Sequence, residues 1–174
     1  SRGVDGIIFW NERETEGRMM VEQGLGRPVV TFCYPSARAD SVMTDFRMGA
    51  RLAVEHLMEQ GRKRIGFFCP SEAVAFWTGN LRLRGYCDTV TEHGGVPLVY
   101  PYESLLSDIE STREAAEALG RSQERPDALF CFNDLVAIGA MMGLRRAGLR
   151  VPEDIALVGF DDIPLAAQLD VPLT

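Results

Sequence analysis

Two short polar segments follow apolar runs in the C-terminal half of the chain. Residues 155–158 (Ile-Ala-Leu-Val) lead through a glycine and a phenylalanine into Asp161 and Asp162, and residues 128–132 lead directly into Asn133 and Asp134. Both runs are typical of strands buried on both faces, and the carboxyl ends of parallel strands are where ligands bind. Carboxylate and amide groups exchange hydrogen bonds with hydroxyls, so the pattern predicts a polar pocket floor for a hydroxyl-rich ligand.

Apolar runs alternate with stretches of helical periodicity along the whole chain. The predicted strands are residues 6–10, 28–33, 64–69, 97–100, 127–131 and 155–158, and the predicted helices are 12–23, 46–60, 81–93, 109–120 and 135–147. Gly61, Gly94 and Gly148 stand where a left-handed helix C-cap is expected, and Asp45 is predicted to cap the helix that begins at residue 46. This alternation predicts an α/β fold with parallel sheets and right-handed crossovers.

The composition is that of a globular protein with an acidic surface. The 174 residues are 46% hydrophobic and 25% charged, with a net charge of −7. Recognition of nucleic acid needs clustered basic side chains, so the acidity argues against DNA binding by this chain itself. The basic clusters at 62–64 and 145–146 border predicted helix ends, where they are interpreted as solvated charges. We find neither a signal-peptide layout nor a run long enough to cross a membrane.

The cysteines predict neither a metal site nor a redox pair. Cys33, Cys69, Cys87 and Cys131 are scattered, and no two have the spacing of a zinc or thiol–disulfide motif. We interpret them as free thiols, mostly buried, in a reducing compartment. No cofactor is predicted.

The sequence also lacks the arrangements that catalysis needs. The adjacent Asp161 and Asp162 cannot face each other across a scissile bond. His56 and His93 have no nearby serine or cysteine nucleophile, and no glycine-rich phosphate loop is present. A non-enzymatic function is therefore expected.

Several ordered segments resemble one protein family. The stretches 132–140 (FNDLVAIGA), 148–155 (GLRVPEDI) and 158–162 (VGFDD) are similar to the effector-binding domain of the lactose/galactose repressor family of bacterial transcription regulators. The resemblance extends to residues 4–9, 27–30, 45–57, 61–67, 82–86 and 172–174, in the family's order.

The resemblance implies a fold like that of periplasmic sugar-binding proteins, with two lobes of helices flanking parallel sheets, incomplete at both ends. On this basis residues 1–60 are assigned to the N-terminal lobe and 61–168 to the C-terminal lobe, and 169–174 begin the crossover back. The aperiodic stretch 35–43 is interpreted as the crossing point between the lobes. Family members begin with a DNA-binding helix-turn-helix segment, which is absent from this chain.

The resemblance also assigns site residues. The arginine of the Arg-x-x-Gly-aromatic motif, Arg82, is expected to reach into the cleft, where its fixed donors suit sugar oxygens or a carboxylate. Asp161 is expected to accept hydrogen bonds from the ligand and Asn133 to face it, although a purely structural Asn133 is the alternative. Asp134 is expected to cap the following helix, and Arg84 to be a surface charge.

Aromatic residues complete the predicted pocket, because the apolar faces of sugar rings stack on them. Phe76 and Thr78 precede Arg82 at the loop that overlooks the cleft in the family, and Trp10 ends the first strand. For Trp10 and Phe76, ordinary packing is an equally weighted alternative.

The expected function is binding of an effector by a cytoplasmic, homodimeric transcription regulator. The effector would be a sugar, a sugar derivative or a nucleoside-like molecule, and operator DNA would be bound through the absent N-terminal segment. The alternative is a periplasmic solute-binding protein of a sugar transporter, because the two classes share a fold.

Overall fold

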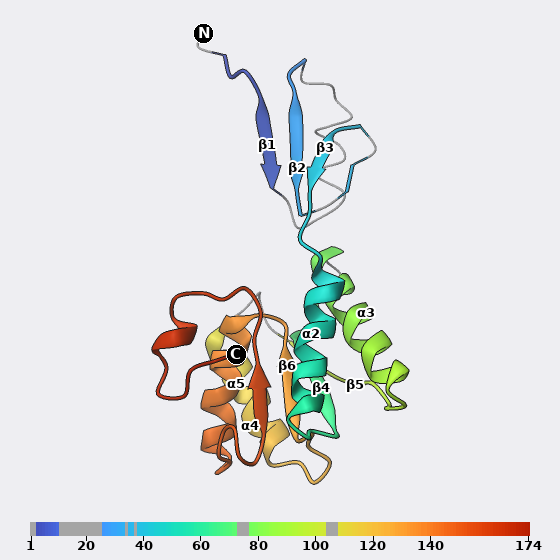
Figure 1. The fold of residues 1–174 in the computed structure, drawn as a ribbon. Coiled ribbons are helices and arrows are strands. Elements are labelled where there is room, and N and C mark those ends of the chain that lie inside the picture. Colours follow the sequence, from blue (N-terminus) through green and yellow to red (C-terminus); the bar gives the residue numbers. More distant parts are fainter. Residues whose placement is uncertain (1–2, 11–25, 34, 37, 73–76, 104–107) are drawn as a thin grey trace.

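The strands form two parallel sheets, which Figure 1 shows one above the other. The computed structural model describes residues 3–10, 26–33, 35–36, 38–72, 77–103 and 108–174, with only the backbone for 77–80. The first sheet has the order β1 (Ile7–Trp10), β2 (Val29–Phe32), β3 (Asp40–Val42). The second has the order β5 (Leu98–Tyr102), β4 (Ile65–Pro70), β6 (Ala128–Cys131), β7 (Ala156–Val158). Across the described ranges, no helix combines the length and apolar character of a membrane span.

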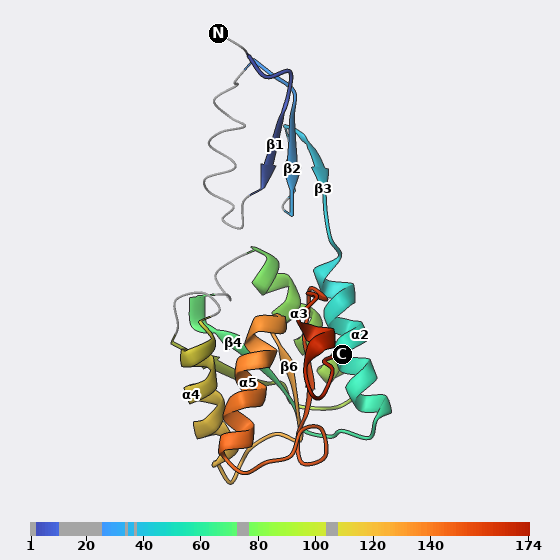
Figure 2. The same ribbon diagram turned by 90° about the vertical axis from the view of Figure 1, so that its left-hand side faces the viewer.

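The four-stranded sheet lies between two pairs of helices. The connections β4 to β5 and β5 to β6 run in opposite directions along the sheet, so right-handed crossovers place their helices on opposite faces. Figure 2 shows this arrangement, with α2 and α3 on one side and α4 and α5 on the other. The helices are α2 (Phe46–Glu59), α3 (Trp77–Glu92), α4 (Ile109–Gly120) and α5 (Asp134–Arg146), and a short 3₁₀ turn, η2 (Ala166–Gln168), follows β7.

Most elements agree with the sequence-based predictions to within two residues at each end. The exceptions are α3, which begins four residues earlier than predicted, and β3 and η2, which have no predicted counterpart. All three residues of β3 are exposed, and the segment shows no alternation of apolar and polar residues that would predict a strand. It nevertheless pairs in parallel with β2, with Asp40 opposite Val30. The helix predicted at 12–23 lies outside the described residues.

The packing of α2 corrects the predicted boundary between lobes at residue 60. This helix packs mainly against α3 and also contacts β6 and β7, all of them elements of the larger sheet's layers. Its buried face includes Ala50, Val54 and Leu57. The second structural unit therefore begins near Asp45, where the side chain accepts the Met48 N–H at 2.9 Å as the predicted N-cap.

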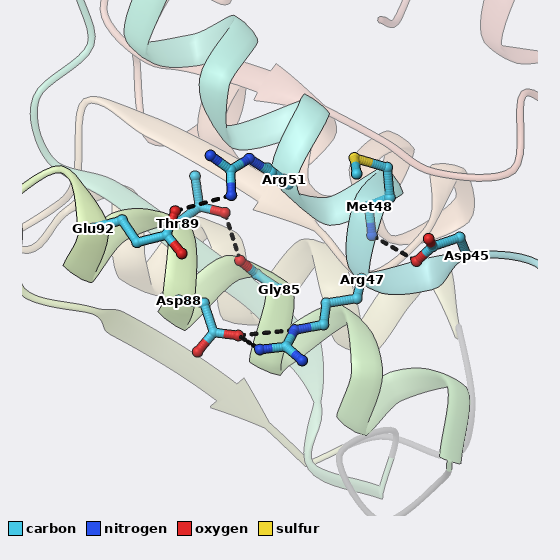
Figure 3. A pocket seen from close by; sticks show the side chains of 8 residues that line it. All are labelled: Asp45, Arg47, Met48, Arg51, Gly85, Asp88, Thr89 and Glu92. Carbon is cyan, nitrogen blue, oxygen red and sulfur yellow. Dashed lines mark hydrogen bonds and ion pairs between the residues drawn. The ribbon is translucent and has the colours of Figure 1, made fainter.

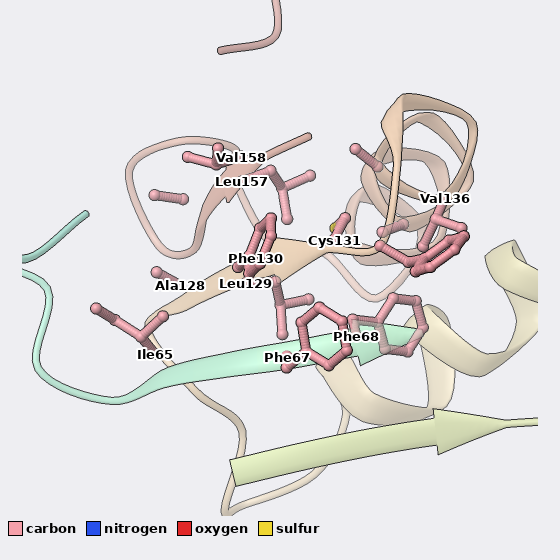
Figure 4. Packing of buried hydrophobic residues seen from close by; sticks show 14 of the residues in the cluster. Ile65, Phe67, Phe68, Ala128, Leu129, Phe130, Cys131, Val136, Leu157 and Val158 are labelled. Carbon is pink, nitrogen blue, oxygen red and sulfur yellow. The ribbon is translucent and has the colours of Figure 1, made fainter. Parts of the chain in front are cut away.

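The core lies on both faces of the four-stranded sheet (Figure 4). Strands β4, β6 and β7 are buried along their whole length, as expected of parallel strands covered by helices. Phe67 lies between Phe130 and Tyr86, with ring centroids 5.2 and 5.5 Å away. The predicted helix C-caps are confirmed, since Gly61, Gly94 and Gly148 have φ of 83°, 77° and 84°.

Candidate ligand-binding site

The carboxyl edge of the four-stranded sheet contains a reversal of strand order. From β4 the chain continues to β5 on one side, whereas from β6 it continues to β7 on the other side. The loops after β4 and β6 therefore diverge, and ligands of open α/β sheets bind in the crevice that forms at such a point. Arg82, Asn133 and Asp161 follow β4, β6 and β7, so the sequence-predicted polar residues gather at this edge.

Arg82 is almost completely buried at this edge, with only 5% of the residue exposed. Its Nη2 donates a hydrogen bond to Oδ1 of Asp161 at 3.2 Å. The guanidinium carbon lies 4.8 Å from the ring centroid of Phe46, 4.6 Å from that of Phe132 and 4.3 Å from that of Phe160. Negative ring faces stabilise a desolvated cation, so the rings offset part of the cost of burying this charge.

These three phenylalanines, here called the aromatic box, come from different elements. Phe46 begins α2, Phe132 follows β6 and Phe160 follows β7. Gly49 makes room for one of them, because a Cβ at this position would lie 2.7 Å from the Phe160 ring. No local pattern in the sequence predicts the aromatic box. The signal that the sequence does contain is that each phenylalanine adjoins a polar residue at a predicted strand or helix end, namely Asp45, Asn133 or Asp161.

Asp161 lies in a loop with an unusual backbone. Its φ is +100° and that of Asp162 is +53°, a region that non-glycine residues seldom adopt. The Asp161 side chain is 44% exposed, so it has access to solvent and to a ligand as well as to Arg82. The loop borders a depression of about 340 Å³, lined by Asp134, Gly159, Phe160, Asp161, Asp162, Ala166, Leu173 and Thr174.

The capping of α5 differs from the prediction, which assigned the cap to Asp134. Asn133 is the N-cap, and its Oδ1 accepts the Val136 N–H at 2.9 Å. Its backbone is extended, with φ −155° and ψ 179°, so the side chain reaches the first turn. Asp134 is already helical and only 3% exposed, and it binds the loop after β7 instead. Asn133 therefore has a structural function, and its amide is also located at the ligand edge.

The remaining predicted contacts are distributed differently. Trp10 ends β1 in the other sheet, is 70% exposed, and meets the Phe32 ring edge-on at a centroid distance of 6.3 Å. Thr78 lies in the first turn of α3, but its side chain is outside the described part, as is the whole of Phe76. Contact of these three residues with a ligand stays a prediction. Arg84 is exposed on α3, as expected.

A second depression lies between α2 and α3 (Figure 3). Here Arg47 pairs with Asp88, and Arg51 pairs with Glu92 at 2.9 Å, so both positive groups are matched by negative groups across the helix pair. All of its lining residues belong to the two helices or to the cap at Asp45. It has no contribution from a strand end, and we assign the candidate site to the sheet edge.

The thiol groups lie apart from this site. No disulfide joins any of the four described cysteines, and Cys33, Cys69 and Cys131 are buried. Burial raises the pKa of the Cys69 thiol to about 12. Among the residues with described positions, no cluster of three or more histidine, cysteine or acidic side chains could hold a metal ion.

A known protein family matches the part of the chain that forms this sheet edge. Residues 54–174, which contain the whole sheet edge, match the periplasmic binding protein-like domain. The chain belongs to this family. The predicted resemblance to lactose/galactose-type regulators is confirmed as well, because similar curated proteins are repressors of that kind.

Two relatives and one solved protein illustrate the similarity. The HTH-type transcriptional repressor PurR of Aliivibrio salmonicida is 33% identical over 98% of this chain and 52% of its own length. The HTH-type transcriptional repressor CytR of Escherichia coli is 32% identical over 100% of this chain and 51% of its own length. A LacI family transcriptional regulator from Lactobacillus casei, solved with bound sucrose, has a TM-score of 0.82 and 26% identity, covering 98% of this chain and 64% of its own. This chain spans about half the length of the curated relatives it matches.

Proposed function

We propose that this chain is the effector-binding part of a bacterial transcription repressor and that it binds a sugar or sugar derivative. The observation that carries the proposal is the Arg82–Asp161 pair within the aromatic box, at the edge where the strand order reverses. A fixed fork of donors beside an exposed carboxylate matches the alternating donors and acceptors of a polyhydroxylated ring.

The comparisons support the two parts of this proposal. The curated relatives named above are transcriptional repressors, and the Lactobacillus casei regulator has been solved with glucose as well as with sucrose. All three of these proteins are named as transcription regulators, which favours a regulator over the solute-binding alternative.

The proposed mechanism couples the ligand to the relative orientation of the two sheets. A ligand held by Arg82, Asn133 and Asp161 on one side, and by Trp10 on the other, stabilises one orientation. DNA-binding segments attached to the first unit then gain or lose operator affinity through that difference in free energy. This chain is acidic, so DNA is bound by the rest of the full-length protein, in the cytoplasm.

We further propose that the full-length protein is a homodimer. Helix α5 is covered by the sheet and by α4, while Met142 is 47% exposed, close in sequence to the buried Met141. Light scattering at micromolar concentration is expected to give twice the monomer mass. A purely monomeric species would contradict this part of the proposal.

The function is tested with the full-length protein and an operator selected from a random DNA library. Calorimetric titration with glucose, sucrose, ribose and adenosine is expected to identify a sugar that binds, and that sugar is expected to change operator affinity in a fluorescence anisotropy assay. Operator affinity that is unchanged at saturating sugar would refute the regulatory mechanism. Binding of adenosine alone would replace the sugar by a nucleoside as the ligand class.

A further inference from the structure

We infer that Asp134 is a positioning residue that holds the loop after β7 so that Asp161 faces Arg82. This inference rests on the proposed ligand-binding function and assigns a role to a carboxylate that does not itself need to touch the ligand. Asp134 is thus not the helix cap that the sequence predicts, because Asn133 caps α5.

Two hydrogen bonds from Asp134 bracket the loop. Its backbone N–H donates to the carbonyl of Phe160 at 2.9 Å. Its Oδ2 accepts the backbone N–H of Ile163 at 2.8 Å. The loop is thereby fixed immediately before Asp161 and immediately after Asp162, and both attachments lead to the first residue of α5.

The carboxylate is well placed to hold this position. Asp134 is 3% exposed, so its hydrogen bond to the loop is shielded from competing water. It also lies in the first turn of α5, where the exposed N–H groups of the helix favour a negative charge. A buried carboxylate with a charge-assisted bond is a stronger anchor than a solvated one.

Gly159 permits this close approach. A Cβ at residue 159 would lie 2.0 Å from Oδ1 of Asp134 and 2.7 Å from a methyl group of Leu173. Any larger residue would push the carboxylate away from the loop, so the glycine of the Gly-Phe-Asp-Asp segment and the aspartate after Asn133 form one packing unit.

The backbone of the loop explains why an anchor is needed. Asp161 and Asp162 both have positive φ, and such conformations persist in non-glycine residues only when the surroundings hold them. Without the Asp134 bonds, the loop can relax to ordinary backbone angles. The distance from Arg82 Nη2 to Asp161 Oδ1 is 3.2 Å, so a shift of the loop by about 1 Å breaks that hydrogen bond.

A double-mutant cycle in the full-length protein distinguishes positioning from general stabilisation. Asp134→Ala is expected to weaken binding of the sugar probe (glucose, sucrose or ribose, whichever the wild type binds) about tenfold, since the Asp161 hydrogen bonds are lost with the loop geometry. In an Asp161→Ala background the same change is expected to have an effect of about twofold or less, because the carboxylate to be positioned is gone. Asp134→Asn keeps an oxygen acceptor for the Ile163 N–H and is expected to restore binding to within about threefold.

Asp127→Ala provides the matched control. Asp127 also accepts backbone N–H groups, from Lys63 and Arg64, but at the opposite edge of the same sheet. This variant is expected to lose thermal stability without losing sugar affinity. Equal losses of affinity in the Asp134 and Asp127 variants would reduce Asp134 to a stabilising residue and overturn the inference.

Hydrogen exchange of the ligand-free protein separates this inference from the proposed function. Asp134→Ala is expected to accelerate exchange of the Ile163 amide at least tenfold, and Asp134→Asn much less. Unchanged exchange at Ile163, or additive effects in the cycle, would refute the positioning role even if sugars bind. Failure of the wild type to bind any sugar, with accelerated exchange in Asp134→Ala, would refute the ligand class while leaving the loop anchor supported.

Discussion

Arg82 shows how a single buried charge can organise the carboxyl edge of a sheet, where we propose that the ligand binds. The three ring centroids of the aromatic box lie within 4.8 Å of its guanidinium carbon, and Asp161 accepts a hydrogen bond from its Nη2, so the group is held in one orientation. Pre-organised donors lose little conformational entropy when a ligand binds, which favours affinity and selectivity for oxygen acceptors.

The first prediction concerns the Arg82–Asp161 pair. Asp161→Ala is expected to lower sugar affinity about tenfold to a hundredfold while the protein stays folded, because the side chain is partly exposed and contributes little packing. Arg82→Ala is expected to abolish binding and also to lower the free energy of unfolding by about 2–4 kcal/mol, since it empties the aromatic box. Calorimetric titration and chemical denaturation measure the two effects.

Arg84→Ala is the control for that prediction, because Arg84 is exposed on the same helix. This variant is expected to keep both the sugar affinity and the free energy of unfolding close to the wild-type values. Wild-type affinity in a folded Asp161→Ala variant would show that the ligand binds elsewhere.

The second prediction separates the two roles of Asn133. Asn133→Asp preserves the N-cap oxygen, so stability is expected to stay near wild type, whereas the loss of the amide N–H donors weakens sugar binding. Asn133→Ala removes the cap as well and is expected to lower the free energy of unfolding by about 1 kcal/mol relative to wild type. Thermal denaturation and titration of both variants provide the test. Unaltered affinity in Asn133→Asp would leave this residue with a structural role alone.

At the scale of elements, the contact between α4 and α5 depends on glycines that let two helices approach closely. A Cβ at Gly143 would lie 2.1 Å from the backbone oxygen of Arg113, and one at Gly139 would lie 2.8 Å from the Thr112 side chain. Backbone atoms cannot rotate away as side chains can, so α4 itself would have to move. Gly139 and Gly143 of α5 thus allow α4 to lie as close to α5 as it does.

The third prediction follows from this contact. Gly143→Ala is expected to destabilise the protein by about 2–3 kcal/mol, although alanine favours helix formation by about 1 kcal/mol. Arg145→Ala, an exposed neighbour on the same helix, is the matched control and is expected to change stability by less than about 0.5 kcal/mol. Urea denaturation with circular dichroism gives both values. Equal stability of the two variants would mean that α4 and α5 can separate without cost.

At the scale of the whole molecule, both structural units contain buried thiols, so the reactivity of the cysteines shows whether each unit is folded. Cys33 follows β2 of the first sheet, while Cys69 and Cys131 lie in strands of the second. Burial raises the pKa of Cys69 to about 12 and that of Cys131 further, so neither forms the reactive thiolate at neutral pH. Cys87, which is half-buried on α3, also has a raised pKa, mainly through burial.

The fourth prediction is a labelling pattern. A thiol-specific reagent at pH 8 is expected to modify Cys87 slowly in the native protein and the other three cysteines only after denaturation. Mass spectrometry of proteolytic peptides identifies the modified residues. Rapid labelling of Cys33 alone would show that the first sheet opens independently of the second.

The sequence by itself determined the order of elements, the parallel sheets and the gathering of polar residues at strand ends. These follow from local signals, because apolar runs of strand length, helical periodicity and glycine caps each depend on residues a few positions apart. Asp45 and the three C-cap glycines were predicted for that reason. Arg82 as a site residue came from the resemblance to a family, since a single arginine on a helix carries no local sign of its surroundings.

Tertiary structure alone decided the contacts between distant residues. The aromatic box joins Phe46, Phe132 and Phe160 from separate elements, and no spacing in the sequence marks rings that meet only after folding. The exchange of roles between Asn133 and Asp134 has the same cause. Both residues can cap a helix locally, and the choice is made by the loop after β7, which brings the Ile163 N–H to Asp134. Helix α2 directly follows the first sheet in the sequence, yet it packs on the larger sheet. Burial of its apolar face there is the physical reason.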